Sequence, residues 1–276
     1  MTQAIPQFII DAFTDSVFGG NPAAVCLLDT PLPDETLQNI AKENNLSETA
    51  YILKKDNGNY HLRWFTPTSE IDLCGHATLA SAFVLFNCVG VVGDTVKFDT
   101  LSGELTVQQV GVKLKMTFPA YTLKNMAITD ELIAKIKNAL GDSIAHALQS
   151  VYLARDLLIV VDDEKLVREC TPDFAKLTEL DGALCHITAP SHGKFDCVSR
   201  SFAPKFGINE DPVCGAGHCH IVPFWSKTLG KVGITAYQAS ERGGILYCND
   251  LGERVELSGQ AVMFGRGKIY IGAKLD

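Results

Sequence analysis

Two Cys-Gly pairs are the residues in this sequence whose types and spacing could do chemistry. Cys74-Gly75 is followed by His76, and Cys214-Gly215 is followed by Ala216, Gly217 and another histidine. Each pair comes after a Phe-x-Pro segment and an acidic residue, and each precedes a run of small and apolar residues that is typical of a buried helix. The unpaired N–H groups of a helix start carry positive partial charge, so such a turn could hold the carboxylate of a substrate.

The spacing of the two pairs indicates a duplication, because about half of the 276-residue chain separates them. Two similar domains would then face each other with both helix starts at their junction, and we expect the active site there. The first of these helices is expected at residues 77–86, with Asp72 as its N-cap.

The elements that must position these turns follow the same order in both halves. A strand expected at 60–65 leads to the first turn, and another expected at 195–202 leads to the second. The pattern predicts an α+β protein in which residues 1–118 form the first domain and 119–276 the second, with the last strand free to pack across to the first half. No Gly-x-Gly-x-x-Gly follows a predicted strand, so a dinucleotide cofactor is not indicated.

Composition excludes several classes of function. The chain has 24 Lys and Arg against 32 Asp and Glu, a net charge of −8, and no basic cluster, which argues against nucleic-acid binding. It has no basic segment followed by an apolar stretch at its start and no apolar run long enough to span a membrane. Nine scattered cysteines suit reduced thiols better than a disulfide framework. We therefore expect a cytoplasmic protein with no nucleic-acid or membrane partner.

The second turn contains residues that could bind a metal ion. Cys214, Cys219, His218 and His220 are close in sequence and have the right donor atoms for zinc. Most of them would lie on different faces of one helix, so the sequence predicts no metal there.

Several segments, spread in order from near the start to near the end of the chain, together resemble the phenazine biosynthesis-like (PhzF-like) family, which is related in fold to diaminopimelate epimerase. They are Asp11-Ala-Phe-Thr, Gly20-Asn-Pro, Leu46-Ser-Glu-Thr-Ala, Phe65-Thr-Pro, Asp72-Leu-Cys-Gly-His-Ala-Thr, Leu101-Ser-Gly-Glu-Leu, Ser199-Arg-Ser-Phe-Ala-Pro, Glu210-Asp-Pro-Val-Cys-Gly and Gln238-Ala-Ser-Glu-Arg-Gly-Gly.

The resemblance implies two pseudo-symmetric domains, each a central helix wrapped by a twisted antiparallel sheet, with the site between them. It implies an isomerase without an organic cofactor or metal, and commonly a homodimer. In the phenazine enzyme a glutamate moves a proton between carbons of a dihydro-hydroxyanthranilate, and that glutamate matches Glu48. The family's active-site histidine matches His76, and its acidic partner matches Asp211.

Two positions depart from the phenazine enzyme. Cys214 stands where that enzyme has a threonine, and Ala216 stands where it has a serine. A hydroxyl is lost, and a thiol is placed opposite Cys74, as in the epimerase relatives. These departures argue against the phenazine substrate itself and keep a two-thiol mechanism open.

Three functional hypotheses follow. In the first, Glu48 is the general acid/base of an isomerase that acts on a small carboxylate-bearing metabolite, with His76 and Asp211 orienting the substrate. In the second, Cys74 and Cys214 form the proton-transfer pair of an amino-acid racemase or epimerase. In the third, the protein is a catalytically silent binding member of the family. The expected substrate-binding residues are Asn21, Ser47, Asp72, Cys74, Gly75, Cys214, Gly215, Ala216, Gly217 and Arg242.

Overall fold

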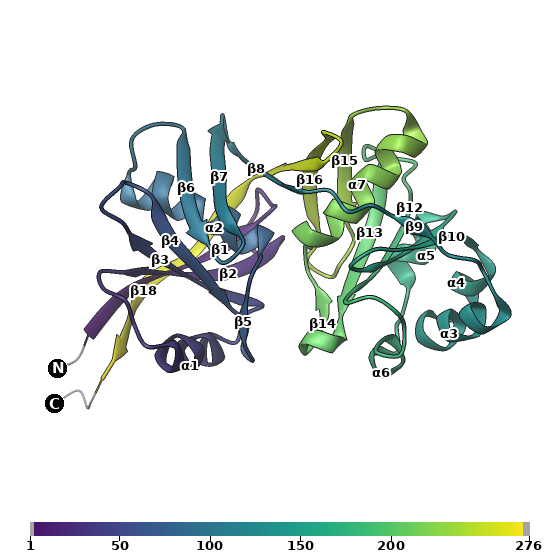
Figure 1. The fold of residues 1–276 in the computed structure, drawn as a ribbon, viewed down its shortest axis with the longest axis horizontal. Coiled ribbons are helices and arrows are strands. Elements are labelled where there is room, and N and C mark those ends of the chain that lie inside the picture. Colours follow the sequence, from purple (N-terminus) through teal and green to yellow (C-terminus); the bar gives the residue numbers. More distant parts are fainter. Residues whose placement is uncertain (1–2, 273–276) are drawn as a thin grey trace. The chain divides into compact units, whose positions relative to one another are not determined.

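The structure is a computed structural model that describes residues 3–272 and divides into two compact units (Figure 1). The N-terminal unit comprises Met1–Thr117 together with Ser258–Asp276, and the C-terminal unit comprises Phe118–Leu257. The sequence-based division ended the first domain at 118 and assigned 119–276 to the second. The end of the chain lies in the N-terminal unit because its last strand pairs with the first strand along ten residues of register.

The N-terminal unit is built around helix α2. Its elements are β1 (Gln3–Ala12), β2 (Asn21–Leu28), α1 (Asp34–Asn44), β3 (Glu48–Lys54), β4 (Tyr60–Phe65), β5 (Glu70–Ile71), α2 (Gly75–Val84), the π-helix η1 (Leu85–Val89), β6 (Thr95–Thr100), β7 (Gly103–Val110), most of β8 (Lys113–Pro119) and β18 (Ala261–Ile271). Strand β1 pairs antiparallel with both β18 and β2, β2 pairs parallel with β3, and β4 pairs antiparallel with β3 and parallel with β6.

The C-terminal unit is built around helix α7. Its elements are β9 (Lys124–Asn125), α3 (Asp130–Leu140), α4 (Asp142–His146), β10 (Leu148–Leu153), β11 (Leu157–Val161), α5 (Glu164–Glu169), α6 (Phe174–Leu177), β12 (Cys185–Pro190), β13 (Cys197–Ala203), the 3₁₀ helix η2 (Pro204–Phe206), β14 (Ile208–Asp211), α7 (Gly215–Leu229), β15 (Gly233–Gln238), β16 (Gly244–Asp250) and most of β17 (Arg254–Gly259). Strands β11 and β12 are parallel, as are β13 and β15, and the pairs β12–β13 and β15–β16 are antiparallel.

The two units repeat one order of elements, which confirms the predicted α+β fold with two similar halves. In each unit, a strand (β2 or β11) is followed by one or two helices, a strand parallel to the first (β3 or β12), an antiparallel strand (β4 or β13), a short strand (β5 or β14) and the central helix. The strand after the central helix (β6 or β15) pairs in parallel with β4 or β13. The sheets are therefore mixed rather than purely antiparallel. Each parallel pair needs a crossover, and α1, α2, α7 and the α5–α6 segment supply one each.

Both central helices begin in the interior of their units, and the buried part of α2 is made mostly of small and apolar residues. Every residue of α2 from Gly75 to Ala82 is buried, so the sheet of its own unit packs around it. The second central helix, α7, continues through Pro223 to Leu229. Among the described residues, no helix combines the length and the apolar character needed to cross a membrane.

Each central helix is capped by a cysteine, and the start of α2 differs from the sequence prediction. Helix α2 begins at Gly75 with Cys74 as its N-cap, two residues after the predicted cap Asp72. Helix α7 has Cys214 as its N-cap, and the Sγ atom of Cys214 accepts a hydrogen bond from the N–H of Gly217 at 3.2 Å. A thiol sulfur is a weaker cap than a carboxylate, so residue type alone favoured Asp72 as the cap of α2.

Candidate active site

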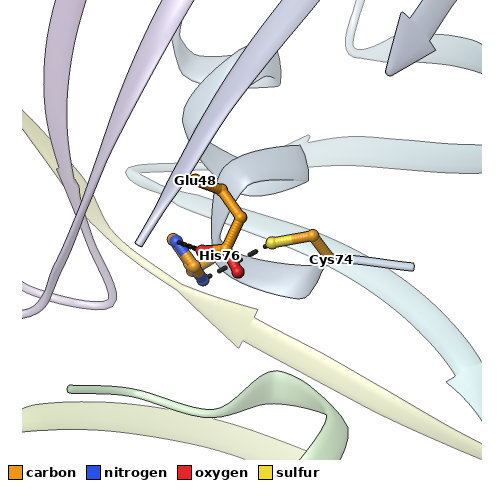
Figure 2. Close-up of side chains that lie close together, drawn as sticks. All are labelled: Glu48, Cys74 and His76. Atoms are coloured by element: carbon orange, nitrogen blue, oxygen red, sulfur yellow. Dashed lines mark hydrogen bonds and ion pairs between the residues drawn. The ribbon is translucent and has the colours of Figure 1, made fainter. Parts of the chain in front are cut away.

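Glu48 and His76 form a buried acid–imidazole pair in the N-terminal unit (Figure 2). Glu48 is the first residue of β3, opposite Ala23 of β2, and His76 lies in the first turn of α2. Nε2 of His76 is 2.9 Å from Oε2 of Glu48, at an angle that falls short of an aligned hydrogen bond. The structure thus places side by side two of the three residues that the sequence predicted to be catalytic.

The other nitrogen of His76 has two neighbours. The side-chain amide nitrogen of Asn21 lies 3.0 Å from Nδ1, and Sγ of Cys74 lies 3.6 Å from the same atom. Asn21 is the first residue of β2 and is buried, and Cys74 immediately precedes α2. Asn21, Glu48, Cys74 and His76 therefore form one cluster, although 55 residues separate Asn21 from His76.

Burial and charge set the protonation of this cluster. Burial raises the pKa of the Cys74 thiol to about 11, and the Glu48 carboxylate adds to that rise. For His76, burial lowers the pKa, but negative charge on Cys74 and Glu48 raises it more, so the net direction is well above the usual value. At neutral pH, Cys74 is therefore a neutral thiol, so its negative charge does not then act on the ring of His76.

The donor atoms of Glu48, Cys74 and His76 are close enough to one another to hold a metal ion. The carboxylate and the thiol approach different nitrogens of the ring, so an ion held by both would displace one of the two contacts. Paired with each other in this way, the three groups are arranged to hold protons, and we assign no metal to them.

The other predicted residues of the N-terminal unit differ in burial. Gly75 is buried in the first turn of α2, and Ser47 is partly buried just before β3. Asp72 is exposed, and its backbone carbonyl accepts a hydrogen bond from Ser102 Oγ at 2.8 Å. Asp72 thus anchors a loop at the surface and does not cap the helix.

The predicted residues of the C-terminal unit gather at the start of α7. Cys214 is buried, its N–H donates to the side-chain carbonyl of Gln238 at 2.8 Å, and Asp211 contributes to the rise of its pKa. Burial is the main cause of that rise, and the pKa of Cys214 lies well above the usual value. Gly215 and Gly217 are buried and Ala216 is partly buried.

Arg242 lies in the loop after β15 and is partly buried. The same loop is tied to the segment before α7, because Ser240 Oγ donates to the carbonyl of Pro212 at 2.8 Å. The loop therefore belongs to the surroundings of the Cys214 turn, as the sequence motif suggested.

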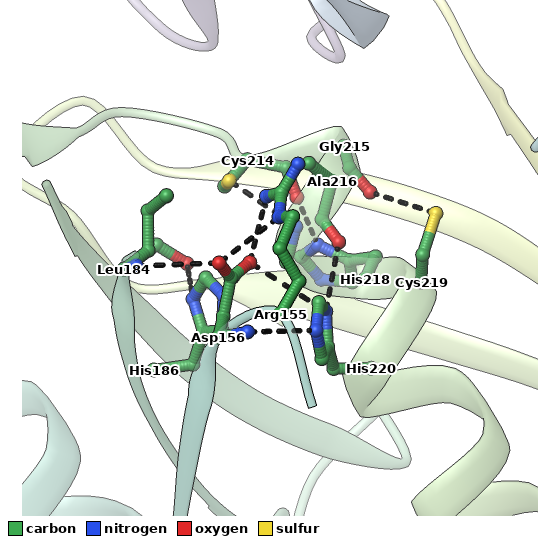
Figure 3. A network of polar contacts seen from close by, with 12 residues as sticks. Arg155, Asp156, Leu184, His186, Cys214, Gly215, Ala216, His218, Cys219 and His220 are labelled. Atoms are coloured by element: carbon green, nitrogen blue, oxygen red, sulfur yellow. Dashed lines mark hydrogen bonds and ion pairs between the residues drawn. The ribbon is translucent and has the colours of Figure 1, made fainter. Parts of the chain in front are cut away.

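A buried polar network lies under this turn, and sequence reasoning missed it (Figure 3). Asp156 has no solvent exposure, and Arg155 binds it with two hydrogen bonds, from Nε at 3.0 Å and from Nη2 at 2.7 Å. His186 Nε2 lies 3.1 Å from Asp156 Oδ2, and His186 Nδ1 lies 2.9 Å from Ser201 Oγ. Burial raises the pKa of Asp156, but its contacts with His186 and Arg155 lower it more, so the carboxylate is ionised in the folded protein.

Two further histidines hold the carbonyls of the first turn of α7. Nδ1 of His218 donates to the carbonyl of Cys214 at 2.7 Å, and Nδ1 of His220 donates to that of Ala216 at 3.2 Å. Nε2 of His220 accepts the N–H of Asp156 at 3.2 Å. Burial lowers the pKa of each of these histidines to about 4, so both rings are neutral.

This network resembles two kinds of functional site, but it is closed to the solvent from which a substrate or a metal ion would enter. Asp156, His186 and Ser201 are linked like a hydrolytic triad, and Asp156, His186 and His220 have donor atoms close enough for a metal. All four residues are fully buried, Arg155 occupies the carboxylate, and both nitrogens of His220 are engaged. The network supports the start of α7. Its one signal in the sequence is the charged pair Arg155-Asp156 within an otherwise apolar run.

The chain is similar in sequence and in fold to known proteins. A family model described as phenazine biosynthesis-like protein (PhzC–PhzF) matches residues 10–267. An uncharacterized isomerase of Pseudomonas aeruginosa is 47% identical over 264 residues, which cover 96% of this chain and 98% of that protein.

Solved structures show the same fold. The crystal structure of a phenazine biosynthesis PhzF-family protein from Enterococcus faecalis has a TM-score of 0.91 and 45% identity, covering 98% of this chain and all of that one. A predicted epimerase from Pseudomonas aeruginosa has a TM-score of 0.75 at 18% identity, over 96% of this chain and 99% of that one, and it shows the fold alone.

Proposed function

Since the chain belongs to the phenazine biosynthesis-like (PhzC–PhzF) family and is an isomerase, we propose that it moves a proton between carbons of a small carboxylate-bearing metabolite, with Glu48 as the general acid/base. The observation that carries this proposal is the buried Glu48 carboxylate, 2.9 Å from the imidazole of His76.

The chemistry needs one group that both takes and returns a proton. Glu48 as carboxylate accepts a proton from a substrate carbon, and the electron pair of the broken C–H bond stays on the substrate, delocalised toward its unsaturated or carboxylate group. The same carboxyl group then returns the proton to another carbon. Nothing is oxidised or reduced, so product and substrate are isomers. His76 steadies the charge of Glu48 in the interval when the carboxylate is ionised.

The protonation of the thiols favours this mechanism over the two-thiol alternative. A racemase pair needs one thiolate, and the pKa of Cys74 is about 11 while that of Cys214 is raised well above its usual value. Both cysteines are thiols at neutral pH, which suits proton donation or packing better than abstraction of a carbon-bound proton.

Asp211 remains our candidate for orienting the substrate, and the turn from Cys214 to Gly217 remains our candidate for holding its carboxylate. The N–H of Gly217 already donates to Cys214 Sγ, so the N–H groups of Gly215 and Ala216 are the better candidates for this role. Ala216 offers no hydroxyl, which favours a substrate other than that of the phenazine enzyme.

Deuterium exchange tests the proposal. The protein is incubated in D₂O with a dihydro-hydroxyanthranilate and with a panel of cyclic amino acids and hydroxy acids, and deuterium incorporation at carbon is followed by NMR. We expect Glu48→Gln to reduce exchange at least about 1,000-fold while the protein stays folded. Glu43→Gln, which changes an exposed carboxylate of α1, is the control and should keep wild-type exchange.

The alternatives give different results. Exchange that survives in Glu48→Gln but disappears in Cys214→Ser would favour the two-thiol mechanism. Binding of a panel member without any exchange, in wild-type protein, would favour the silent binding protein.

A further inference from the structure

We propose that Asn21, together with the Cys74 thiol, is a positioning group that keeps the Nδ1 atom of His76 as an acceptor and so holds the ring proton on Nε2, facing Glu48. The sequence had assigned Asn21 to substrate binding. The consequence for catalysis rests on the proposed function, but the position of the proton does not.

The direction of the Asn21 contact follows from its chemistry. The atom of Asn21 that faces His76 is its amide nitrogen, 3.0 Å from Nδ1, and an amide NH₂ group can only donate. Whenever the ring is neutral, Nδ1 therefore presents its lone pair to Asn21. In a neutral imidazole, one nitrogen accepts and the other carries the proton, so the proton lies on Nε2.

The Cys74 contact acts in the same direction. Its sulfur is 3.6 Å from Nδ1, and with a pKa of about 11 the group is an S–H donor at neutral pH. Two donors on Nδ1 disfavour a proton there, because an Nδ1–H would face an NH₂ group and an S–H group inside a buried cluster.

The proton on Nε2 is placed where Glu48 needs it. Nε2 lies 2.9 Å from Oε2 of Glu48, so a proton on Nε2 places positive partial charge beside the carboxylate that is to accept a proton from the substrate. The opposite tautomer would turn a nitrogen lone pair toward the carboxylate and repel it. Within the described residues, Glu48 of β3 and Cys74 are the titratable groups in contact with the ring.

Long-range ¹H–¹⁵N spectra of ¹⁵N-histidine-labelled protein test this inference directly. Among the signals of the seven histidines, those of His76 are identified by their loss in His76→Gln. As the pH rises, we expect the neutral ring of His76 to keep its proton on Nε2, with Nδ1 showing the shift of an unprotonated nitrogen. A neutral ring protonated on Nδ1 would overturn the proposal.

Two variants of Asn21 make the test quantitative. Asn21→Ala removes the donor, and the neutral ring should become a mixture of tautomers. Asn21→Asp replaces the donor by an acceptor, so the doubly protonated ring should persist to higher pH than in the wild type. Unchanged spectra in both folded variants would contradict a positioning role for Asn21.

The control is Asn44→Asp, which changes another partly buried amide of the same unit. Asn44 Nδ2 donates to Thr49 Oγ1 at 3.1 Å, and no contact joins it to His76 among its hydrogen bonds. It should leave the His76 spectrum unchanged. The two proposals fail on different results. A neutral His76 ring protonated on Nδ1 in the wild type refutes this inference, whereas undiminished deuterium exchange at carbon in Glu48→Gln refutes the proposed function.

Discussion

Gly217 lies directly against the imidazole of His186. A Cβ atom at Gly217 would stand 2.7 Å from Cε1 and 2.9 Å from Nδ1 of that ring, and 3.1 Å from Ser201 Oγ. The ring has no room to withdraw, because Asp156 binds one of its nitrogens and Ser201 the other. The absence of a side chain at Gly217 is what lets the first turn of α7 rest on the buried network.

The first prediction tests this close packing. Gly217→Ala should lower the free energy of unfolding by about 1–3 kcal/mol, since overpacking a rigid core forces a backbone or ring shift. Urea denaturation followed by circular dichroism measures the change. Gly193→Ala, at a position where an added Cβ meets nothing within 4 Å, is the control and should change the stability little. Equal stability of Gly217→Ala and the wild type would show that the ring can move.

The second prediction concerns the carboxylate of Asp156. Asp156→Asn should cost about 2–3 kcal/mol of unfolding free energy, because charged hydrogen bonds to Arg155 and His186 become neutral or are lost. Part of the Arg155 side chain is exposed, so water compensates for some of the loss and the cost stays moderate. Chemical denaturation measures it, with the exposed Asp181→Asn as the control. An unfolding free energy equal to that of the wild type would mean that the network contributes nothing to stability.

Local signals in the sequence predicted the two helix starts and the fold class, and the resemblance to a known family supplied the residues of the N-terminal cluster. The Cys-Gly turns and the small residues after them are each contained in a few neighbouring residues. The resemblance to a known family then related these segments to one another.

The Asp156 network could not be predicted, because its members are assembled only by the fold. Asp156, His186, Ser201 and His220 come from a turn, two strands and a helix, and none belongs to a motif with fixed spacing. Arg155 and Asp156 lie in the short turn between β10 and β11. The N-cap at Asp72 was wrong for a related reason, since a cap depends on where the backbone enters the helix and not only on residue type.

The third prediction is an acid dependence of stability that arises in the C-terminal unit. The pKa values of His218 and His220 are lowered to about 4 in the folded protein, against about 6.5 in an unfolded chain. Between these values the unfolded chain binds protons that the folded protein does not. The unfolding free energy should therefore fall as the pH falls from about 6.5 to about 4, by up to about 1.4 kcal/mol per pH unit for each histidine.

Denaturation at a series of pH values measures this slope. The variant His220→Gln should show a shallower slope in the same window, whatever its stability at neutral pH. His192→Gln, which removes an exposed histidine, should keep the wild-type slope. A slope that is unchanged in His220→Gln would show that this ring is not held neutral.

The fourth prediction concerns the reactivity of the thiols. All nine cysteines are free, and Cys88 is the one that is partly exposed rather than buried. With a pKa of about 11, Cys74 has only about one molecule in 10,000 as thiolate at neutral pH, and burial restricts access further. Iodoacetamide should therefore label Cys88 in the native protein long before Cys74 or Cys214, as measured by peptide mass spectrometry. The Cys88→Ser protein should stay almost unlabelled until it is unfolded in urea. Rapid labelling of Cys74 or Cys214 in that native variant, with parallel loss of deuterium exchange, would instead indicate a reactive thiolate and favour the two-thiol mechanism over Glu48.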